Sequence, residues 1–592
     1  MPGPNPDPLT LAEISRLFPL QRLEPIKRGG FEIGLVLGGT VSAGAYTAGV
    51  LDYLIEALDA WIRAKEESSA EAPMHDVIIS TIAGASGGAI YASVFARASG
   101  WSFPHQAEES NPFYRAAVGV DFKGLLSPDP EAGRPLGSLF NSTAMDDSAA
   151  RILGFEGKGL GSNGTPTQRT YLADPVRLFL MVGNLTGIPY TIKFSSQAEL
   201  EHDLISHSDF VRFGVSVDGG IPNEPKLRPD EISLHQRSPE NWDLLRTAAL
   251  ASSAFPGLLR ARPLQRKLEL LRYRVTMLPR EQGLPDVIPL VPKWGELRDG
   301  EPLEGVVNFA GIDGGVFNNQ PFDVVRHSLA GLLGRNNRVG AEADRAVIMV
   351  DPFSDAVPLG PRIPPPLFEL LLPFLGSLIY QARFKPEDIA LAQKEDVYSR
   401  FLIAPYGPGP GETPMAGKRA LASGGLGGFL GFVDRGFFHY DFLVGRRNAY
   451  EFLRSEFIFP ESNPIFDQWT EAQKAAQRAP SPNGNSIPVK DGYLPMIPLM
   501  QQLRENPPRA MTSALWPRLR KLPEYVPSAI ERRLDAIYDS LRHDFQPRNC
   551  LDLKYMIVSA YVWVGWRFGV RGALRESALE TIKHALKDQR LL

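Results

Sequence analysis

A serine flanked by glycines is the first residue whose type and spacing could do chemistry. Ser86 is the centre of Gly84–Gly88, which reads G-x-S-x-G. A serine hydroxyl is a poor nucleophile unless a base takes its proton and its Oγ is held exposed, and a sharp strand-to-helix turn exposes it. Gly84 and Gly88 let the backbone make that turn, because glycine has no Cβ. The pattern predicts a nucleophile elbow; the alternative is a tight turn whose serine is incidental.

A glycine-rich turn earlier in the chain could stabilise negative charge. Gly38, Gly39 and Thr40 follow an apolar run and precede a helical pattern. Backbone N–H groups at such a turn face outward, and the dipole of the following helix adds positive potential. Because neither the P-loop pattern nor the dinucleotide pattern G-x-G-x-x-G is matched, an oxyanion hole beside Ser86 is favoured over a phosphate site. A plain turn without a ligand is the alternative.

An aspartate supplies the third polar group. Asp313 begins an Asp-Gly-Gly sequence directly after an apolar run over 305–312. A carboxylate at the C-terminal end of a strand projects to the edge where α/β folds place their sites. The residues that follow predict a helix start, with Asn319 or Gln320 at the N-cap and Pro321 in the first turn. Standing alone, Asp-Gly-Gly would more simply be a turn whose aspartate binds nearby backbone N–H groups.

Strands and helices must alternate to position these three turns. Phe31–Leu37 predicts a short buried strand, and residues 45–63 repeat apolar side chains at helical spacing. A second strand–turn–helix unit spans residues 76–98. Further strands are expected over 176–182, 190–194, 211–217, 305–312 and 345–350. This alternation indicates an α/β fold with a mainly parallel sheet covered on both faces.

Composition narrows the class of protein and of cofactor. The 592 residues are 43% hydrophobic and 22% charged, which excludes disorder, collagen and coiled coil as the main state. Cys550 is the single cysteine, so an intramolecular disulfide and a cysteine-based metal site are excluded, and the nine histidines lack metal-binding spacing. We therefore expect neither a metal nor a cofactor. The net charge of −4 gives no reason to expect nucleic acid as a partner.

Membrane and targeting signals are weak. Met1–Pro8 contains four prolines and no apolar stretch, so no signal peptide is predicted. Apolar runs such as Met556–Trp566 are shorter than the about 20 residues that span a bilayer, and we expect a cytoplasmic protein without a transmembrane helix. Residues 501–592 contain 16 Lys and Arg and 10 Asp and Glu, a net charge of +6. This tail is either a solvated helical surface or a face that meets anionic lipid, which would make the protein peripheral to membranes.

Together the three turns resemble those of the patatin-like phospholipases. That family has a glycine-rich oxyanion turn, a G-x-S-x-G serine and a D-G-G/A aspartate in this order, here within Leu37–Leu51, Gly84–Gly88 and Asp313–Gly315. Ala249–Gly257 is also similar to the segment that precedes the aspartate in the family. The resemblance covers about residues 31–330. It implies a three-layer α/β/α core and a phospholipase A-like lipid acyl hydrolase that cleaves carboxylic ester bonds of glycerolipids.

The resemblance also implies roles for the site residues. Ser86 would be the nucleophile and Asp313 its general base, in a dyad without histidine. Gly38, Gly39 and Thr40 would supply the oxyanion donors, and an acyl-enzyme would be released by water. Elementary chemistry agrees, because an aspartate can deprotonate serine if a dry site raises its pKa and the contact is short.

Two alternatives remain, one from a departure from the family pattern and one from the positions of the histidines. The family commonly places a basic residue just after the glycines, and the corresponding residue here is Ala43. The first alternative is a catalytically silent lipid-binding or scaffold protein that keeps the fold. The second is a Ser-Asp-His esterase or thioesterase, because His327 and His439 both follow Asp313 as the histidine does in α/β-hydrolases.

The motifs divide the chain into three predicted regions. These are an N-terminal extension over 1–30, a patatin-like catalytic domain over 31–355 and a mostly helical C-terminal region over 356–592. In the last, the apolar stretch Leu367–Tyr380 is either a core helix or a segment that lines an acyl groove or lies on a membrane. The glycine-rich Ser423–Gly431 is either a lid or a loop. The sequence carries no indication of oligomeric state.

Overall fold

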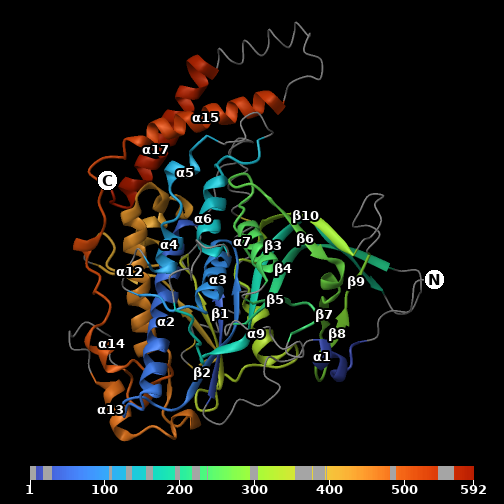
Figure 1. Cartoon of the computed structure of the whole chain (residues 1–592), viewed down its shortest axis with the longest axis vertical. Helices are drawn as coiled ribbons and strands as arrows, with labels where there is room; N and C mark the ends of the chain where they lie inside the picture. The colour runs from blue at the N-terminus through green and yellow to red at the C-terminus, as the bar shows by residue number, and fades with distance from the viewer. Residues whose placement is uncertain are drawn as a thin grey trace.

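The alternating strands and helices form one sheet with helices on both faces in the computed structural model (Figure 1). The expected α/β class with a three-layer core and a helical C-terminal region is confirmed. The structure describes residues 8–17, 30–105, 110–128, 136–154, 165–193, 201–216, 227–235, 238–293, 305–353, 377, 394, 396–411, 413–479, 489–544 and 566–592.

Ten strands make up the main sheet. β12, β11, β1, β2 and β3 are parallel neighbours in that order. β4, β10 and β9 run antiparallel to β3, β6 runs antiparallel to β10, and β5 is parallel to β4. The bounds are β1 Gly30–Leu37, β2 Asp76–Gly84, β3 Leu172–Lys193, β4 Glu201–Val215, β5 Ile232–Leu234, β6 Arg262–Lys267, β9 Val291–Pro292, β10 Val306–Asp313, β11 Arg345–Val350 and β12 Arg400–Ile403.

The long strand β3 brings two other strands end to end. β4 pairs with β3 from Val176 to Lys193 and so occupies one of its edges. On the other edge β2 pairs with β3 as far as Leu180, the partner of Gly84, and β10 pairs with β3 from Asn184 to Val182, the partner of Asp313. Because β2 is parallel to β3 and β10 is antiparallel, their C-terminal ends meet along this edge.

This arrangement corrects two expectations from the sequence. Residues 176–182 and 190–194 were expected as separate strands, but β3 is continuous through Gly183–Ile188, where its pairing register with β4 shifts. The polar turn-like residues there mark an irregularity in a strand and not a turn. Asp313 does lie at the C-terminal end of a strand, but that strand is antiparallel to the core, so it approaches the site from the opposite direction.

Side chains that alternate along the strands pack against different helices. On one face, Leu35, Leu37 and Leu178 belong to a large core with α2, α3, α7 and α12. On the other face, Val36 and Phe179 pack with residues of α9. The bounds are α2 Gly44–Glu66, α3 Gly87–Ala98, α7 Pro239–Ser252, α9 Phe322–Ala330 and α12 Arg435–Glu451. These helices complete the three layers, and α2, α3 and α9 each follow one of the three predicted turns.

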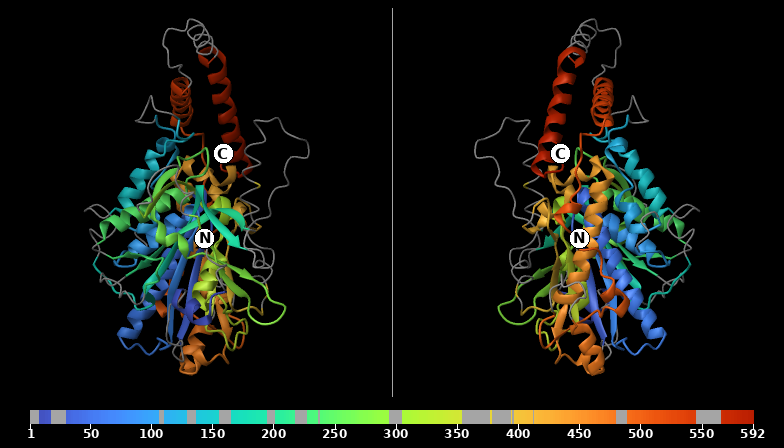
Figure 2. Two further views of the ribbon diagram at one scale, coloured as in Figure 1. Left: turned by 90° about the vertical axis from the view of Figure 1, so that its right-hand side faces the viewer. Right: turned by 90° about the vertical axis from the view of Figure 1, so that its left-hand side faces the viewer.

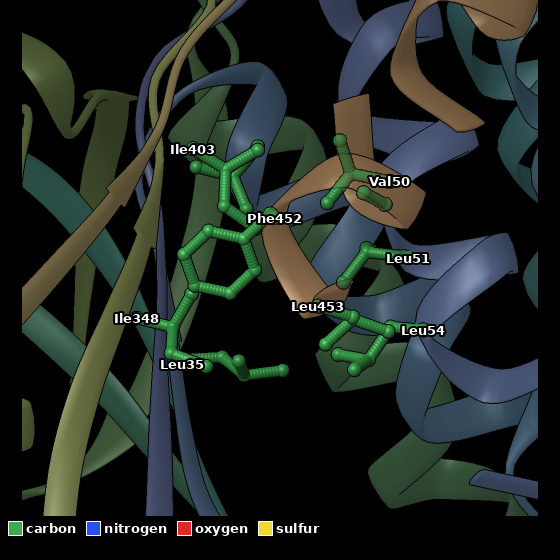
Figure 3. Close-up of a pocket in the computed structure, with 10 residues that line it drawn as sticks. Leu35, Val50, Leu51, Leu54, Ile348, Ile403, Phe452 and Leu453 are labelled. Atoms are coloured by element: carbon green, nitrogen blue, oxygen red, sulfur yellow. The ribbon is translucent and has the colours of Figure 1, made fainter. Parts of the chain in front are cut away.

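Residues beyond 355 complete this same core. β12 extends the parallel sheet next to β11, and α12 packs along α2. A small apolar gap remains between the sheet and these two helices, lined by residues such as Leu35, Leu54 and Phe452 (Figure 3). The division at residue 355 stays a prediction, but the sheet continues across it. The apolar stretch over 367–380 lies outside the described residues except for Ser377.

Further elements surround the core. Two long C-terminal helices, α15 and α17, contact one another and project from one end of the molecule (Figures 1 and 2). The remaining helices are α1 Leu11–Leu17, α4 Pro112–Ala117, α5 Phe122–Leu125, α6 Thr143–Leu153, α8 Gly315–Asn318, α13 Glu471–Arg478, α14 Gln501–Glu505, α15 Tyr525–Asp544 and α17 Arg571–Asp588. The small hairpins pair β7 Val275–Leu278 with β8 Asp286–Pro289, β13 Tyr406–Gly407 with β14 Met415–Ala416, and β15 Ile458–Pro460 with β16 Tyr493–Pro495.

Candidate active site

Ser86 lies on a sharp turn between β2 and α3. Its φ of 53° and ψ of −132° are a backbone conformation that non-glycine residues rarely adopt. The flanking glycines are required by close approach of backbone: a Cβ at Gly84 would lie 2.5 Å from the carbonyl oxygen of Gly88, and one at Gly88 would lie 2.2 Å from that of Leu37. The G-x-S-x-G pattern therefore reflects how tightly the turn packs on itself and on β1.

Asp313 lies at the end of β10 and is 3% exposed. The Gly315 N–H donates a 2.7 Å hydrogen bond to its Oδ1, which orients the carboxylate. A Cβ at Gly314 would lie 2.1 Å from the carbonyl oxygen of Met181 on β3. The Asp-Gly-Gly sequence thus fits the tip of β10 against β3 while leaving Oδ2 for another donor.

The structure brings Ser86 and Asp313 together, although 227 residues separate them in the chain. Ser86 Oγ donates a hydrogen bond of 2.7 Å to Asp313 Oδ2. Burial raises the pKa of Asp313 to about 7, while the hydrogen bonds from Ser86 and from the Gly315 N–H lower it. A carboxylate with a pKa near neutrality can accept a proton and return it, which is what a general base requires.

The glycine-rich turn lies against Ser86, but its three N–H groups are not equivalent. The Gly38 N–H donates to the carbonyl oxygen of Val350 at 3.1 Å, which extends the ladder between β1 and β11. Its assignment as an oxyanion donor is therefore not supported in this arrangement. Within the described part of the chain the N–H groups of Gly39 and Thr40 donate to no acceptor, and a Cβ at Gly39 would lie 3.2 Å from Ser86 Cβ.

The histidines considered for a triad bind other groups. His439 lies on α12 with its Nδ1 3.5 Å from the Tyr114 hydroxyl, and the Nε2 of His327 on α9 is 2.6 Å from a guanidinium nitrogen of Arg326. Among the described residues no histidine makes a hydrogen bond to Ser86 or Asp313.

Two polar residues near the dyad were not predicted from the sequence as site residues. The Ser252 Oγ accepts a 3.0 Å hydrogen bond from the Ser86 N–H. The Asn319 Oδ1 lies between the glycine-rich turn and the Asp313 turn. It would lie 2.3 Å from a Cβ at Gly39 and 2.6 Å from a Cβ at Gly315. The resemblance of Ala249–Gly257 to the family could have pointed to Ser252, but not to its hydrogen bond.

The expected cap of α9 is wrong. Pro321 and not Asn319 or Gln320 is the N-cap, and it makes no side-chain cap hydrogen bond. The Gln320 Nε2 instead donates to Asp351 Oδ2 at 2.6 Å, beyond the end of β11. Gln320, which local capping rules would place at the start of the helix, thus makes a tertiary hydrogen bond to Asp351 instead.

Comparison with known proteins identifies the family. Residues 35–326 match the sequence model of the patatin-like phospholipases. The chain is also 32% identical over 549 residues to the uncharacterized protein y4iI of Sinorhizobium fredii (strain NBRC 101917 / NGR234), a match that covers 86% of this chain and 75% of the relative. The chain belongs to the patatin-like phospholipase family. This membership supports a lipid acyl hydrolase in general terms.

A solved structure also matches the chain, at low similarity. The crystal structure of VipD from Legionella pneumophila aligns with a TM-score of 0.18 and 10% sequence identity. The alignment covers 58% of this chain and 52%, or about half, of VipD. At this score the match carries no argument about fold or function.

In this member of the family, the residue that replaces the usual cation cannot reach solvent. Ala43 is 0% exposed in a short 3-10 turn over Val41–Ala43, and its N–H donates to the carbonyl oxygen of Thr40 at 2.9 Å. Its methyl group contributes no charge to the site. The cation that the family commonly has after the glycines is therefore missing at this position.

The glycine-rich segment expected as a lid or a loop packs against the oxyanion turn. It forms 3-10 turns over Ala422–Gly424, Leu426–Gly428 and Leu430–Val433. Ser42 donates to the carbonyl oxygen of Gly428 and accepts a 3.1 Å hydrogen bond from the Gly431 N–H. These hydrogen bonds attach the segment to Ser42, two residues after Thr40.

Metal sites and membrane-spanning helices depend on clustered ligands and on long apolar helices. Among the described residues, no group of three or more His, Cys, Asp and Glu side chains is arranged to hold a metal ion. No helix in the same part of the chain combines the length and the apolar character needed to cross a bilayer.

Proposed function

We propose that this patatin-like phospholipase is a serine acyl hydrolase that cleaves carboxylic ester bonds of glycerolipids through Ser86 and Asp313. The observation that carries the proposal is the 2.7 Å hydrogen bond from Ser86 Oγ to the buried Asp313, whose pKa burial raises to about 7. The family supports a lipid ester as the class of substrate.

Acylation begins with proton transfer from Ser86 to Asp313. Oγ attacks the ester carbonyl carbon as Asp313 Oδ2 takes the hydroxyl proton, and the carbonyl oxygen becomes an oxyanion. The N–H groups of Gly39 and Thr40 are the donors proposed for this oxyanion, and each such donor is typically worth about 3–4 kcal/mol of barrier. Collapse of the intermediate breaks the ester bond, and Asp313 returns its proton to the departing alcohol.

Deacylation repeats these steps with water. Asp313 takes a proton from a water molecule, whose oxygen attacks the acyl carbon bound to Ser86 Oγ. When this second intermediate collapses, Oγ leaves with the proton held by Asp313, and the free fatty acid departs. The dyad is then restored.

Separate substitution of the two dyad residues tests this proposal. With a short-chain p-nitrophenyl ester and a phospholipid in mixed micelles, Ser86→Ala and Asp313→Asn should each lower kcat by about 10³-fold or more, as removal of a nucleophile or base does in other serine hydrolases. A fluorophosphonate probe should label the wild type at Ser86 and should not label Ser86→Ala.

Matched variants separate the dyad from its alternatives. Ser93→Ala removes a buried hydroxyl of α3 that binds only the carbonyl oxygen of Ala89 in its own helix, and it should keep its activity. His327→Ala and His439→Ala should also keep most of theirs, whereas an inactive His439→Ala would indicate a triad. A wild type that neither labels nor hydrolyses either substrate would identify a silent lipid-binding protein instead.

We also propose that the basic tail binds anionic lipid, so that the enzyme acts at a membrane surface. Exposed Arg518, Arg520 and Arg590 lie on two segments that are hydrogen-bonded to each other, because the Leu519 N–H donates to the carbonyl oxygen of Leu591 at 2.6 Å. Exposed cations gathered in this way attract anionic head groups.

A further inference from the structure

Ser252, at the end of helix α7, accepts hydrogen bonds from two backbone N–H groups. One belongs to the turn of Ser86 and the other to the turn of Asp313. Ser252 is the last residue of α7 and is 0% exposed. Its Oγ accepts the N–H of Ser86 at 3.0 Å, and its carbonyl oxygen accepts the N–H of Gly314 at 3.1 Å. The neighbouring Asp313 N–H donates to the carbonyl oxygen of Ala254 at 3.0 Å. The end of α7 therefore contacts both halves of the dyad.

The Ser86 N–H needs this acceptor because the sheet no longer supplies one. The ladder between β1 and β2 ends at Gly84, and the Ala85 N–H still reaches the carbonyl oxygen of Leu37 at 3.2 Å. Ser86 is the next residue, and its φ of 53° is held only if the surroundings over-determine it. An N–H that is shielded from water is destabilising without an acceptor, so the Ser252 hydroxyl stabilises the turn in the conformation that presents Oγ.

We propose that Ser252 is a positioning residue that keeps Ser86 Oγ aligned with Asp313 Oδ2. Its hydroxyl fixes the backbone of the nucleophile, and its carbonyl group fixes the backbone beside the base. One residue thus sets the separation of two groups that come from different strands. The inference rests on the proposed function, and it adds a role for a side chain that need not touch the substrate.

Kinetics of a Ser252→Ala variant test the inference. We expect kcat to fall about 10–100-fold with KM within about twofold of wild type, because a misaligned nucleophile slows the chemical step without removing a contact to the substrate. The rate of labelling by a fluorophosphonate probe should fall by a similar factor. Hydrogen exchange of the Ser86 amide should become faster, which is a readout that requires no activity.

Two further variants make the result specific. Ser253→Ala is the matched control, and it should match wild type in all three measurements. Among the described residues, the Ser253 hydroxyl donates only to the carbonyl oxygens of Ala249 and Leu250 in the last turn of α7. Ser252→Cys fills nearly the same space with a weaker acceptor, so it should lose kcat without creating a cavity.

Each outcome decides between the two proposals. A Ser252→Ala or Ser252→Cys variant with the kcat and the Ser86 exchange rate of wild type would overturn the positioning role. Equal losses in Ser252→Ala and Ser253→Ala, or a change confined to KM, would overturn it as well. Failure of the proposed function is seen separately, as full activity of Ser86→Ala in the same assay.

Discussion

Asp313 shows how the surroundings of a single residue change its acid–base property. Its carboxylate is almost completely buried, and among the described residues only Ser86 and Gly315 donate hydrogen bonds to it. Burial disfavours the charged form, so the pKa is raised to about 7 although both hydrogen bonds act in the opposite direction. The same environment that destabilises the carboxylate makes it a better base for a serine hydroxyl.

The pH dependence of activity follows from this pKa. Only the ionised form of Asp313 can accept the Ser86 proton, so kcat/KM should rise with pH through an acid limb with an apparent pKa near 7. Activity at pH 6 should be about tenfold below the plateau reached above pH 8. The profile is measured with a p-nitrophenyl ester, and circular dichroism checks that the protein stays folded. An acid limb near pH 4 would contradict a buried aspartate as the base.

At the scale of elements, short turns outside the matched motifs pack beside the glycine-rich turn that contains Gly38, Gly39 and Thr40. Asp441 on α12 is 0% exposed and accepts the N–H groups of Ala422 at 2.7 Å and Ser423 at 3.1 Å. Burial raises the pKa of Asp441 to about 7, against these hydrogen bonds. Asp441 therefore connects α12 to the 3-10 turns that pack on Ser42, next to the oxyanion turn.

Loss of the Asp441 carboxylate should destabilise the fold more than loss of an ordinary helix cap. Asp441→Ala leaves two buried N–H groups without their acceptor, and we expect the free energy of unfolding to fall by about 2–4 kcal/mol, measured by urea denaturation. Asp434→Ala is the control, because Asp434 caps α12 by accepting one hydrogen bond, from the Gly436 N–H, and its loss should cost about 1 kcal/mol. Equal costs for the two variants would show that Asp441 is only a local cap.

At the scale of the whole molecule, the C-terminal region is both structural and positively charged. Leu503, Leu586 and Leu591 are buried in the main core, so removal of residues 501–592 would expose apolar surface as well as remove charge. A test of lipid binding therefore needs substitutions on the surface and an intact chain.

Neutralising three exposed arginines should weaken binding to anionic vesicles. The combined variant Arg518→Gln, Arg520→Gln and Arg590→Gln should bind phosphatidylserine-containing vesicles about 100-fold more weakly in a flotation assay, since each basic residue near the surface contributes about 1 kcal/mol. Binding to pure phosphatidylcholine should not change. The matched control replaces the exposed Arg63, Arg335 and Arg338 by Gln, which removes the same charge elsewhere. An equal loss in the control would mean that net charge and not this patch determines binding.

The residues of the candidate site could be predicted from the sequence because their constraints are local. Gly84 and Gly88 must be glycines because a Cβ at either position would collide with backbone a few residues away or on the neighbouring strand. The three motifs can also be recognised by their order along the chain. Short apolar strands such as β1, which is buried along its whole length, and helices with apolar stripes could be predicted for the same reason, since each pattern lies within one element.

Tertiary structure alone decided how these residues meet. The antiparallel direction of β10, the use of the Gly38 N–H by Val350 and the hydrogen bond from Ser86 to Ser252 join residues that lie far apart in the chain. Such pairings produce no periodic pattern and no fixed spacing in a single sequence. Each hydrogen-bond partner comes from a different element, and only the folded chain brings the two together. The sequence by itself thus determined which side chains could do chemistry, and packing decided which of them are close enough to do it.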